Sequence, residues 1–185
     1  MTKPISIPSP VAITPDSALG LFLGQLHDLY RAETQLGVSL ETLATLANHR
    51  SLRHMIVKHL AEIDLQKERI VSIFRSYGIT APLIGNNERL PLIEMDQDRL
   101  TAAPSLETRD VLLIVQCMKI DQYEIAAYET TARLAEQLGL ITEAEILAEC
   151  LAERDSSAEI LRKLQAEILR LAFPTEIDPD PIFHD

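Results

Sequence analysis

Four glutamates interrupt an otherwise apolar helical pattern, and their carboxylates carry the chemistry that the sequence suggests. Each of them falls at or beside a position where a 3,4 spacing of leucine, isoleucine and alanine predicts a core side chain. These residues are Glu33, Glu62, Glu124 and Glu153. Because a buried carboxylate is costly unless it is paired, four of them in one core need protons, hydrogen-bond donors or a metal ion.

The spacing of the glutamates predicts that they lie at one height in a bundle. Glu33 and Glu62 are 29 residues apart, and so are Glu124 and Glu153. Each pair brackets a short turn, and at a rise of ~1.5 Å per residue its two members differ in height by about one helical turn. All four carboxylates are therefore expected to converge near the middle of the molecule.

Two further polar residues extend this candidate site. His59 precedes Glu62 by three residues and Asp121 precedes Glu124 by three, so each shares a helix face with its glutamate. Four carboxylates with few interior cations would repel one another in a low dielectric, so either several are protonated or a metal compensates them. Carboxylates with an imidazole suit iron or manganese, and zinc less well. The structural alternative for His59 is a hydrogen-bonded core histidine.

Four helical segments have to position these residues. We expect them at about residues 16–48, 51–77, 105–138 and 142–172. Very short turns join the first to the second and the third to the fourth, which predicts antiparallel hairpins. About 27 residues separate the hairpins, and a crossover along the length of the bundle explains so long a connection. The predicted fold is all-α, a ferritin-like four-helix bundle of two antiparallel hairpins joined by a long crossover.

Proline-rich segments flank the predicted bundle. Residues 1–15 contain four prolines and no apolar periodicity, which predicts an extended N-terminal arm. The bundle is expected at residues 16–173, with its crossover loop at about 78–104. Residues 174–185 are acidic, contain three prolines and are interpreted as a C-terminal tail.

Composition excludes several classes of function. The 185-residue chain carries a formal net charge of −11, which argues against a general nucleic-acid binder and against adsorption to an anionic membrane. It has no apolar run of the ~18–20 residues that span a membrane and no signal-peptide pattern, so we expect a cytoplasmic protein. The two cysteines, Cys117 and Cys150, fall at apolar helical positions and are interpreted as buried thiols.

The residues around the glutamates resemble a known family. Residues 26–36 (LHDLYRAETQL) resemble the opening signature of the YciE/YciF-type ferritin-like family of bacterial stress proteins. Residues 59–62 (HLAE), 123–128 (YEIAAY) and 151–153 (LAE) resemble its second, third and fourth helices. The resemblance covers about residues 17–172 and implies a fold similar to rubrerythrin and the di-iron carboxylate bundles. Because members of the family tend to dimerise, it also implies a homodimer.

Carried over by position, the resemblance implies a di-metal site. Its candidate ligands are Glu33, Glu62, Glu124 and Glu153, with Asp121 as the additional carboxylate of the third helix. Di-iron bundles usually carry Glu-x-x-His on two helices, whereas Leu65 and Ser156 stand three residues after Glu62 and Glu153. His59 can supply an imidazole from the other side. This departure leaves a weakened or mononuclear site as an open alternative.

Two functions agree with these residues. The first is a carboxylate-bundle protein that binds one or two transition-metal ions, acts in a stress response and reacts with peroxide or oxygen. The second is a non-catalytic, metal-free dimeric bundle with a structural or interaction role. No Gly-rich phosphate loop or other organic-cofactor motif is present. The sequence does not decide whether the protein is an enzyme, and metal content distinguishes the two functions.

Overall fold

The structure, a computed structural model, describes residues 17–82 and 97–174. The predicted N-terminal arm, nearly all of the C-terminal tail and the middle of the crossover lie outside these described residues. All regular structure in the described part of the chain is helical. The helices are α1 (Ala18–Leu46), α2 (Arg50–Ser76), α3 (Gln97–Thr101), α4 (Leu106–Gln137) and α5 (Ile141–Ala172).

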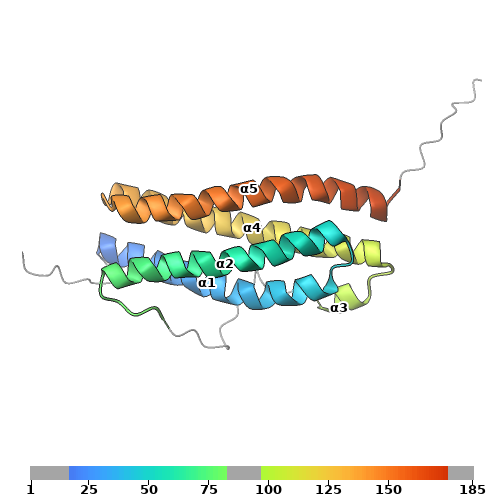
Figure 1. Ribbon diagram of the computed structural model, residues 1–185, viewed down its shortest axis with the longest axis horizontal. Coiled ribbons are helices and arrows are strands. Elements are labelled where there is room, and N and C mark those ends of the chain that lie inside the picture. Colours follow the sequence, from blue (N-terminus) through green and yellow to red (C-terminus); the bar gives the residue numbers. More distant parts are fainter. Residues whose placement is uncertain (1–16, 83–96, 175–185) are drawn as a thin grey trace, which may run out of the picture.

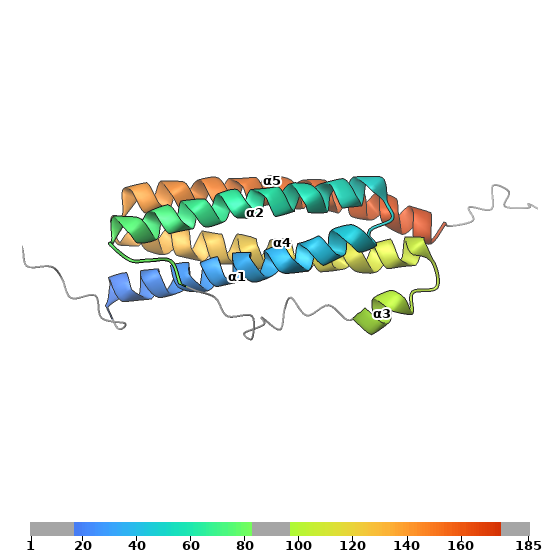
Figure 2. The same cartoon turned by 60° about the horizontal axis from the view of Figure 1, so that its bottom comes forward.

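The four long helices form the predicted bundle of two antiparallel hairpins (Figures 1 and 2). α1 and α2 make the first hairpin, α4 and α5 make the second, and the hairpins pack through α1 against α4 and through α2 against α5. α2 ends at one end of the bundle and α3 lies near the other (Figure 1). The prediction of a ferritin-like four-helix bundle is confirmed.

The predicted crossover loop is not entirely irregular. Its last part contains the short helix α3, whose Leu100 is only 6% exposed and packs into the apolar core. This helix lies beside the end of the bundle where α1 turns into α2 (Figure 2). The buried leucine therefore anchors the connection just before α4 begins.

Local sequence signals account for the ends of the helices. Ser17 caps α1, because its hydroxyl accepts a hydrogen bond from the N–H of Gly20 at 3.0 Å. Ser105 caps α4 in the same way, accepting from the N–H of Thr108 at 3.1 Å. Gly78 and Gly139 adopt positive φ angles of 68° and 70° after α2 and α4, a conformation that favours glycine.

A buried polar layer divides the apolar core into two clusters. One cluster surrounds Leu40, Ile56 and Leu113, towards the α1–α2 turn, and the other surrounds Leu26, Ile70 and Leu147, towards the α4–α5 turn. Among the described residues, the polar layer between them contains side chains that are at most 5% exposed. These are Glu33, His59, Gln66, Asp121, Glu124, Arg154 and Ser157.

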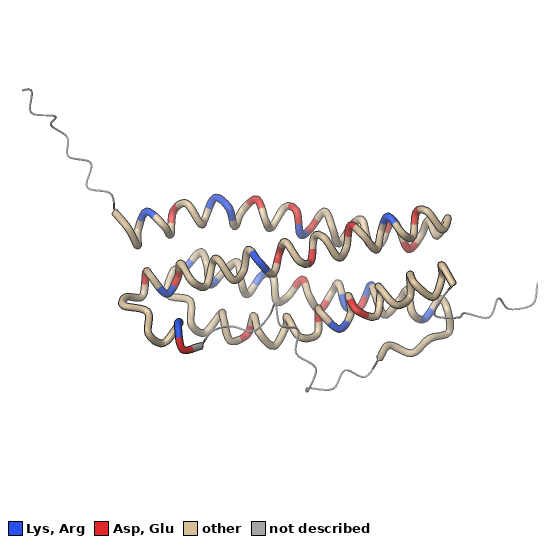
Figure 3. The backbone as a smooth tube through the Cα atoms, turned by 180° about the vertical axis from the view of Figure 1, so that it is seen from behind, with Lys and Arg blue, Asp and Glu red and all other residues tan. Residues whose placement is uncertain are grey.

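The outside of the bundle is charged and mixed in sign. Acidic and basic residues are interspersed along the long helices (Figure 3). None of the described helices combines the length and the apolar character needed to cross a membrane.

Candidate metal centre

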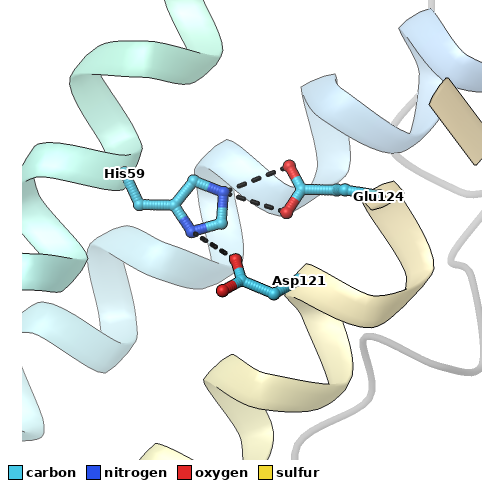
Figure 4. A group of neighbouring side chains, drawn as sticks. All are labelled: His59, Asp121 and Glu124. Atoms are coloured by element: carbon cyan, nitrogen blue, oxygen red, sulfur yellow. Dashed lines mark hydrogen bonds and ion pairs between the residues drawn. The ribbon is translucent and has the colours of Figure 1, made fainter. Parts of the chain in front are cut away.

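Three side chains from two helices meet in the polar layer. His59 of α2 and Asp121 and Glu124 of α4 each offer a ligand atom, and these atoms lie within 4.8 Å of one another. His59 Nε2 lies 3.1 Å and 3.0 Å from the two oxygens of Glu124, and its Nδ1 lies 3.7 Å from Asp121 Oδ1. The imidazole therefore stands between the two carboxylates (Figure 4). All three residues are buried.

Helix geometry explains why these residues converge. Asp121 and Glu124 are three residues apart on α4, so both side chains leave the same face of the helix. His59 continues the buried stripe of α2 that also contains Ile56 and Ile63. Because the stripe faces the bundle interior, the imidazole reaches the carboxylates of α4 across the core.

Several buried polar atoms of this cluster have no hydrogen-bond partner within the described residues. They are both oxygens of Asp121 and the hydroxyl of Ser157, while Oε2 of Glu124 has a 3.0 Å contact with His59 Nε2. Leaving a buried polar atom unsatisfied costs about 1–3 kcal/mol, and more when the atom is charged. A cation bound between these oxygens would satisfy them. Two ligands of one ion lie no more than about 4.4 Å apart, given metal–oxygen distances of ~2.2 Å. The ligand atoms of His59, Asp121 and Glu124, all within 4.8 Å of one another, are thus close to this limit.

Glu33 of α1 lies beside the three-residue group. Its Oε1 accepts a hydrogen bond of 2.7 Å from the hydroxyl of Tyr128, and its Oε2 has no such partner in the described part of the chain. Glu33 does not belong to the His59, Asp121 and Glu124 group itself. Burial, and next the charge of Glu124, raise the pKa of Glu33 to about 8.

The protonation states of the cluster make cation binding dependent on pH. Burial raises the pKa of Glu124 to about 8 and that of Asp121 to about 6. Burial, and next the charge of Arg154, lower the pKa of His59 to about 4. His59 is therefore neutral at pH 7 and keeps the lone pair that a metal ligand needs. Glu33 and Glu124 hold protons that a metal ion can displace.

The polar layer also contains a cation that the sequence interpretation did not include. Arg154 of α5 is fully buried, and its Nη2 forms an ion pair with Oε2 of Glu62. Its Nη1 lies 4.0 Å from both Asp121 Oδ1 and Glu124 Oε2. Burial alone would lower the pKa of Arg154, but the surrounding carboxylates outweigh burial and raise it. One positive charge is thus fixed at the edge of the candidate metal centre.

The remaining two predicted ligands lie further out. The side chain of Glu62 is 17% exposed and is held by Arg154 and by Lys58 Nζ at 2.9 Å. The side chain of Glu153 is 36% exposed, and its two oxygens accept hydrogen bonds of 2.8 Å and 2.9 Å from Arg69. The structure therefore brings together His59, Asp121 and Glu124, places Glu33 and Glu62 around them, and leaves Glu153 outside. The expectation of an interior glutamate from each helix holds for Glu33 of α1 and Glu124 of α4, whereas Glu62 of α2 and Glu153 of α5 are partly exposed.

The phase of the buried stripe on α5 explains this difference. The 3,4 spacing that predicts a core position for Glu153 also includes Cys150 and Ser157, whereas the observed buried stripe passes through Cys150, Arg154 and Ser157. The predicted and the observed stripe have the same 3,4 spacing, and every second residue, such as Cys150 and Ser157, belongs to both stripes. A signal did exist, because the observed stripe continues through Ile168, whereas the predicted one continues through Glu167. Counting charged residues along both stripes would have favoured the one that contains Arg154.

The two cysteines are free and buried, as expected. Burial raises the pKa of Cys117 to about 12 and that of Cys150 to about 11, so neither thiol ionises near neutral pH. Cys150 also accepts a long contact of 3.6 Å from Arg69 Nη1. Both residues therefore act as core side chains in this structure.

The connectivity of the helices and the buried carboxylate–histidine layer together define a class, the ferritin-like carboxylate bundles. Within it, the chain belongs to the family described as domain of unknown function DUF892, which matches residues 17–172. The family resemblance of the sequence motifs is thereby confirmed.

Similar proteins are known from bacteria. The protein YciF of Escherichia coli strain K12 is 34% identical over 138 residues, which cover 74% of this chain and 83% of YciF. The crystal structure of the E. coli stress protein YciF superposes with a TM-score of 0.76 at 31% identity, covering 84% of this chain and 98% of that one. YcfI of Rhodopseudomonas palustris gives a TM-score of 0.73 at 25% identity, covering 82% of this chain and 96% of that chain.

Proposed function

We propose that this protein binds one divalent transition-metal ion through His59, Asp121 and Glu124. The observation that carries the proposal is the pair of buried Asp121 oxygens without hydrogen-bond partners among the described residues, close to a neutral imidazole. Glu33 supplies a third carboxylate next to these ligands. Oxygen and nitrogen donors of this kind favour iron or manganese, with zinc as the less favoured ion.

Charge balance supports one ion. When fully ionised, Glu33, Glu62, Asp121 and Glu124 carry four negative charges. Arg154 and Lys58 compensate two of these through the contacts with Glu62 and its neighbours. One divalent ion compensates the other two. A second divalent ion would leave a positive excess in the core, which is costly in a low dielectric.

The protein residues have distinct tasks in such a site. His59, Asp121 and Glu124 would hold the ion, and the hydroxyl of Tyr128 orients Glu33 through its 2.7 Å hydrogen bond. The apolar clusters on both sides of the layer exclude bulk water. Bound iron or manganese would supply the capacity to react with peroxide or oxygen. A role in a stress response agrees with the description of E. coli YciF as a stress protein. The expected homodimer and cytoplasmic location remain predictions.

Metal analysis of protein purified without chelator tests the proposal. We expect close to one equivalent of iron or manganese, or one equivalent after reconstitution with Fe²⁺ or Mn²⁺. His59→Ala should lose the ion, because it removes the only nitrogen ligand of the group. His54→Ala is the matched control, since His54 lies on the same helix and is exposed. Trace metal only, unchanged after reconstitution, contradicts the proposal.

A metal-free structural bundle is the second candidate. Two interactions within the chain favour it: Arg154 forms an ion pair with Glu62, and the hydroxyl of Tyr128 donates a hydrogen bond to Glu33. These two carboxylates therefore have partners without a metal ion. If this candidate holds, Glu33→Leu should stabilise the protein without any change in metal content, because replacing a buried acid by an apolar side chain is often favourable. If the metal proposal holds, Glu33→Leu should weaken metal binding.

A further inference from the structure

Arg154 is unusual among the cations of this protein. Of the lysines and arginines in the described ranges, it alone is fully buried, and it lies in the middle of the bundle rather than at an end. Its Nε and Nη1 have no hydrogen-bond partner within those ranges. Burying a guanidinium with incomplete hydrogen bonding is costly, so its position requires a compensating electrostatic role.

The position of the guanidinium supplies that role. One of its nitrogens is paired with Glu62, while another lies 4.0 Å from an oxygen of Asp121 and from an oxygen of Glu124. It therefore bridges the outer carboxylate of α2 and the inner carboxylates of α4. Metal ions in two-metal sites lie about 3.5–4 Å apart and share carboxylate ligands. A second ion next to the proposed one would need these same oxygens.

We infer that the Arg154 guanidinium occupies the half of the carboxylate cluster that a second metal ion would require, and that it limits the centre to one ion. This inference rests on the proposed function, because it concerns the capacity of the same site. A guanidinium stays protonated at all ordinary pH values, so it cannot give up its place by losing its charge. Because the guanidinium is covalently part of the chain, a chelator cannot remove its charge as it removes a metal ion.

Removing this charge should therefore change the number of ions bound. Arg154→Gln leaves Glu62, Asp121 and Glu124 without the shared cation and opens the space of the guanidinium. With one divalent ion bound, one negative charge then remains uncompensated, whereas none remains in the unsubstituted protein, so the variant binds a second divalent ion more readily. Arg69→Gln is the matched control, because Arg69 joins the same two helices through Glu153 but does not contact the cluster.

The experiment is a titration of metal-free, full-length protein with Mn²⁺, followed by calorimetry, by metal analysis after gel filtration and by electron paramagnetic resonance. We expect one equivalent in the unsubstituted protein and in Arg69→Gln, and two equivalents in Arg154→Gln. Two neighbouring Mn²⁺ ions give a spin-coupled spectrum that a single ion does not give. One equivalent in folded Arg154→Gln, or two in the unsubstituted protein, overturns the inference.

A second variant covers the case in which Arg154→Gln does not fold, which circular dichroism reveals. The single ion of the unsubstituted protein should not use Glu62, which Arg154 holds, so Glu62→Gln should keep one equivalent. Loss of the ion in Glu62→Gln overturns the inference. If the unsubstituted protein binds no Mn²⁺, the proposed function fails. Binding of Mn²⁺ by Arg154→Gln alone would then still support the role of Arg154. If neither protein binds Mn²⁺, both the proposed function and the inference are refuted.

Discussion

At the level of single residues, bound protons and neighbouring hydrogen-bond or charge partners compensate the cost of burying the carboxylates. Tyr128 donates to Glu33, the imidazole of His59 lies between Asp121 and Glu124, and the guanidinium of Arg154 reaches the remaining side. Without a metal, burial keeps Glu33 and Glu124 protonated near neutral pH. The same residues therefore have a neutral form without metal and an ionised form that suits a cation.

The pH dependence of stability should reveal the buried proton of Glu33. Its pKa is raised from an ordinary value of 4.5 to about 8, so between these values the folded state keeps a proton that the unfolded state loses. The stabilisation from Glu33 is thus complete below about pH 4.5 and is lost as the pH rises to about 8. With chelator present, the free energy of unfolding should fall over this range.

Glu33→Gln isolates this contribution. The amide does not titrate, so urea denaturation with chelator between pH 5 and pH 8.5 should give a smaller decline than the unsubstituted protein gives. The difference should approach about 1.4 kcal/mol per pH unit, the value for one proton. Glu124 and Asp121 still contribute a decline of the same sign. Equal slopes for the two proteins would show that Glu33 is already ionised in the folded state.

At the level of helices, the sequence predicted the stripes of α1 and α2 well. Glu33 and His59 stand in stripes whose other members are almost all apolar, so only one phase is compatible with a core. α5 has apolar residues on both sides of its stripe, such as Ile146 with Leu147 and Ile160 with Leu161. Two phases then compete on apolar residues alone, and only the smaller number of charged residues in the second phase favours the one in which Arg154 faces inward.

The turn between α1 and α2 depends on an interaction that local sequence patterns do not reveal. Asp110, only 2% exposed at the start of α4, accepts hydrogen bonds of 2.8 Å from the N–H groups of Asn48 and His49. These partners are 62 and 61 residues away. Because His49 caps α2 without a side-chain hydrogen bond of its own, Asp110 provides the partners that this helix start lacks.

We expect Asp110→Ala to destabilise the protein by about 2–4 kcal/mol, because two hydrogen bonds to a charged acceptor are lost and two N–H groups lose their partners. Asp64→Ala is the matched control, since Asp64 is 77% exposed and pairs only loosely with Lys67 at 3.5 Å. That change should cost less than about 0.5 kcal/mol. Urea denaturation measures both, and equal effects would contradict the role of Asp110. Metal content should stay unchanged in both variants.

Across the whole molecule, the two hairpins contribute to the polar layer in related ways. Glu33 and Glu124, the first glutamates of the two hairpins, are fully buried, whereas Glu62 and Glu153, the second ones, are partly exposed. Each of the exposed pair is bound by an arginine of the other hairpin. The equal spacing in the sequence predicted that the two hairpins match, but it predicted convergence of all four carboxylates and not this division into buried and partly exposed ones. It could not predict the arginines, because they occupy different positions in the two hairpins and break the symmetry.

A metal ion bound in this layer would connect both hairpins and should stabilise the whole bundle. An ion present at about 100 times its Kd adds about 2.7 kcal/mol to the free energy of unfolding. Because binding displaces protons from Glu33 and Glu124, affinity should increase with pH up to about 8, where both pKa values lie. The stability of the chelated protein falls over the same range. The difference in Tm between protein with Mn²⁺ and protein with chelator should therefore widen from pH 6 to pH 8.

Thermal unfolding at pH 6, 7 and 8 measures this difference directly. His59→Ala should give no difference at any pH, since the imidazole ligand is gone, while His54→Ala should behave as the unsubstituted protein does. A difference that does not change with pH would mean that the ion binds carboxylates that were already ionised, away from the buried layer. A difference that persists in His59→Ala would place the ion on the acidic surface. Only the widening, His59-dependent difference agrees with a metal centre between the hairpins.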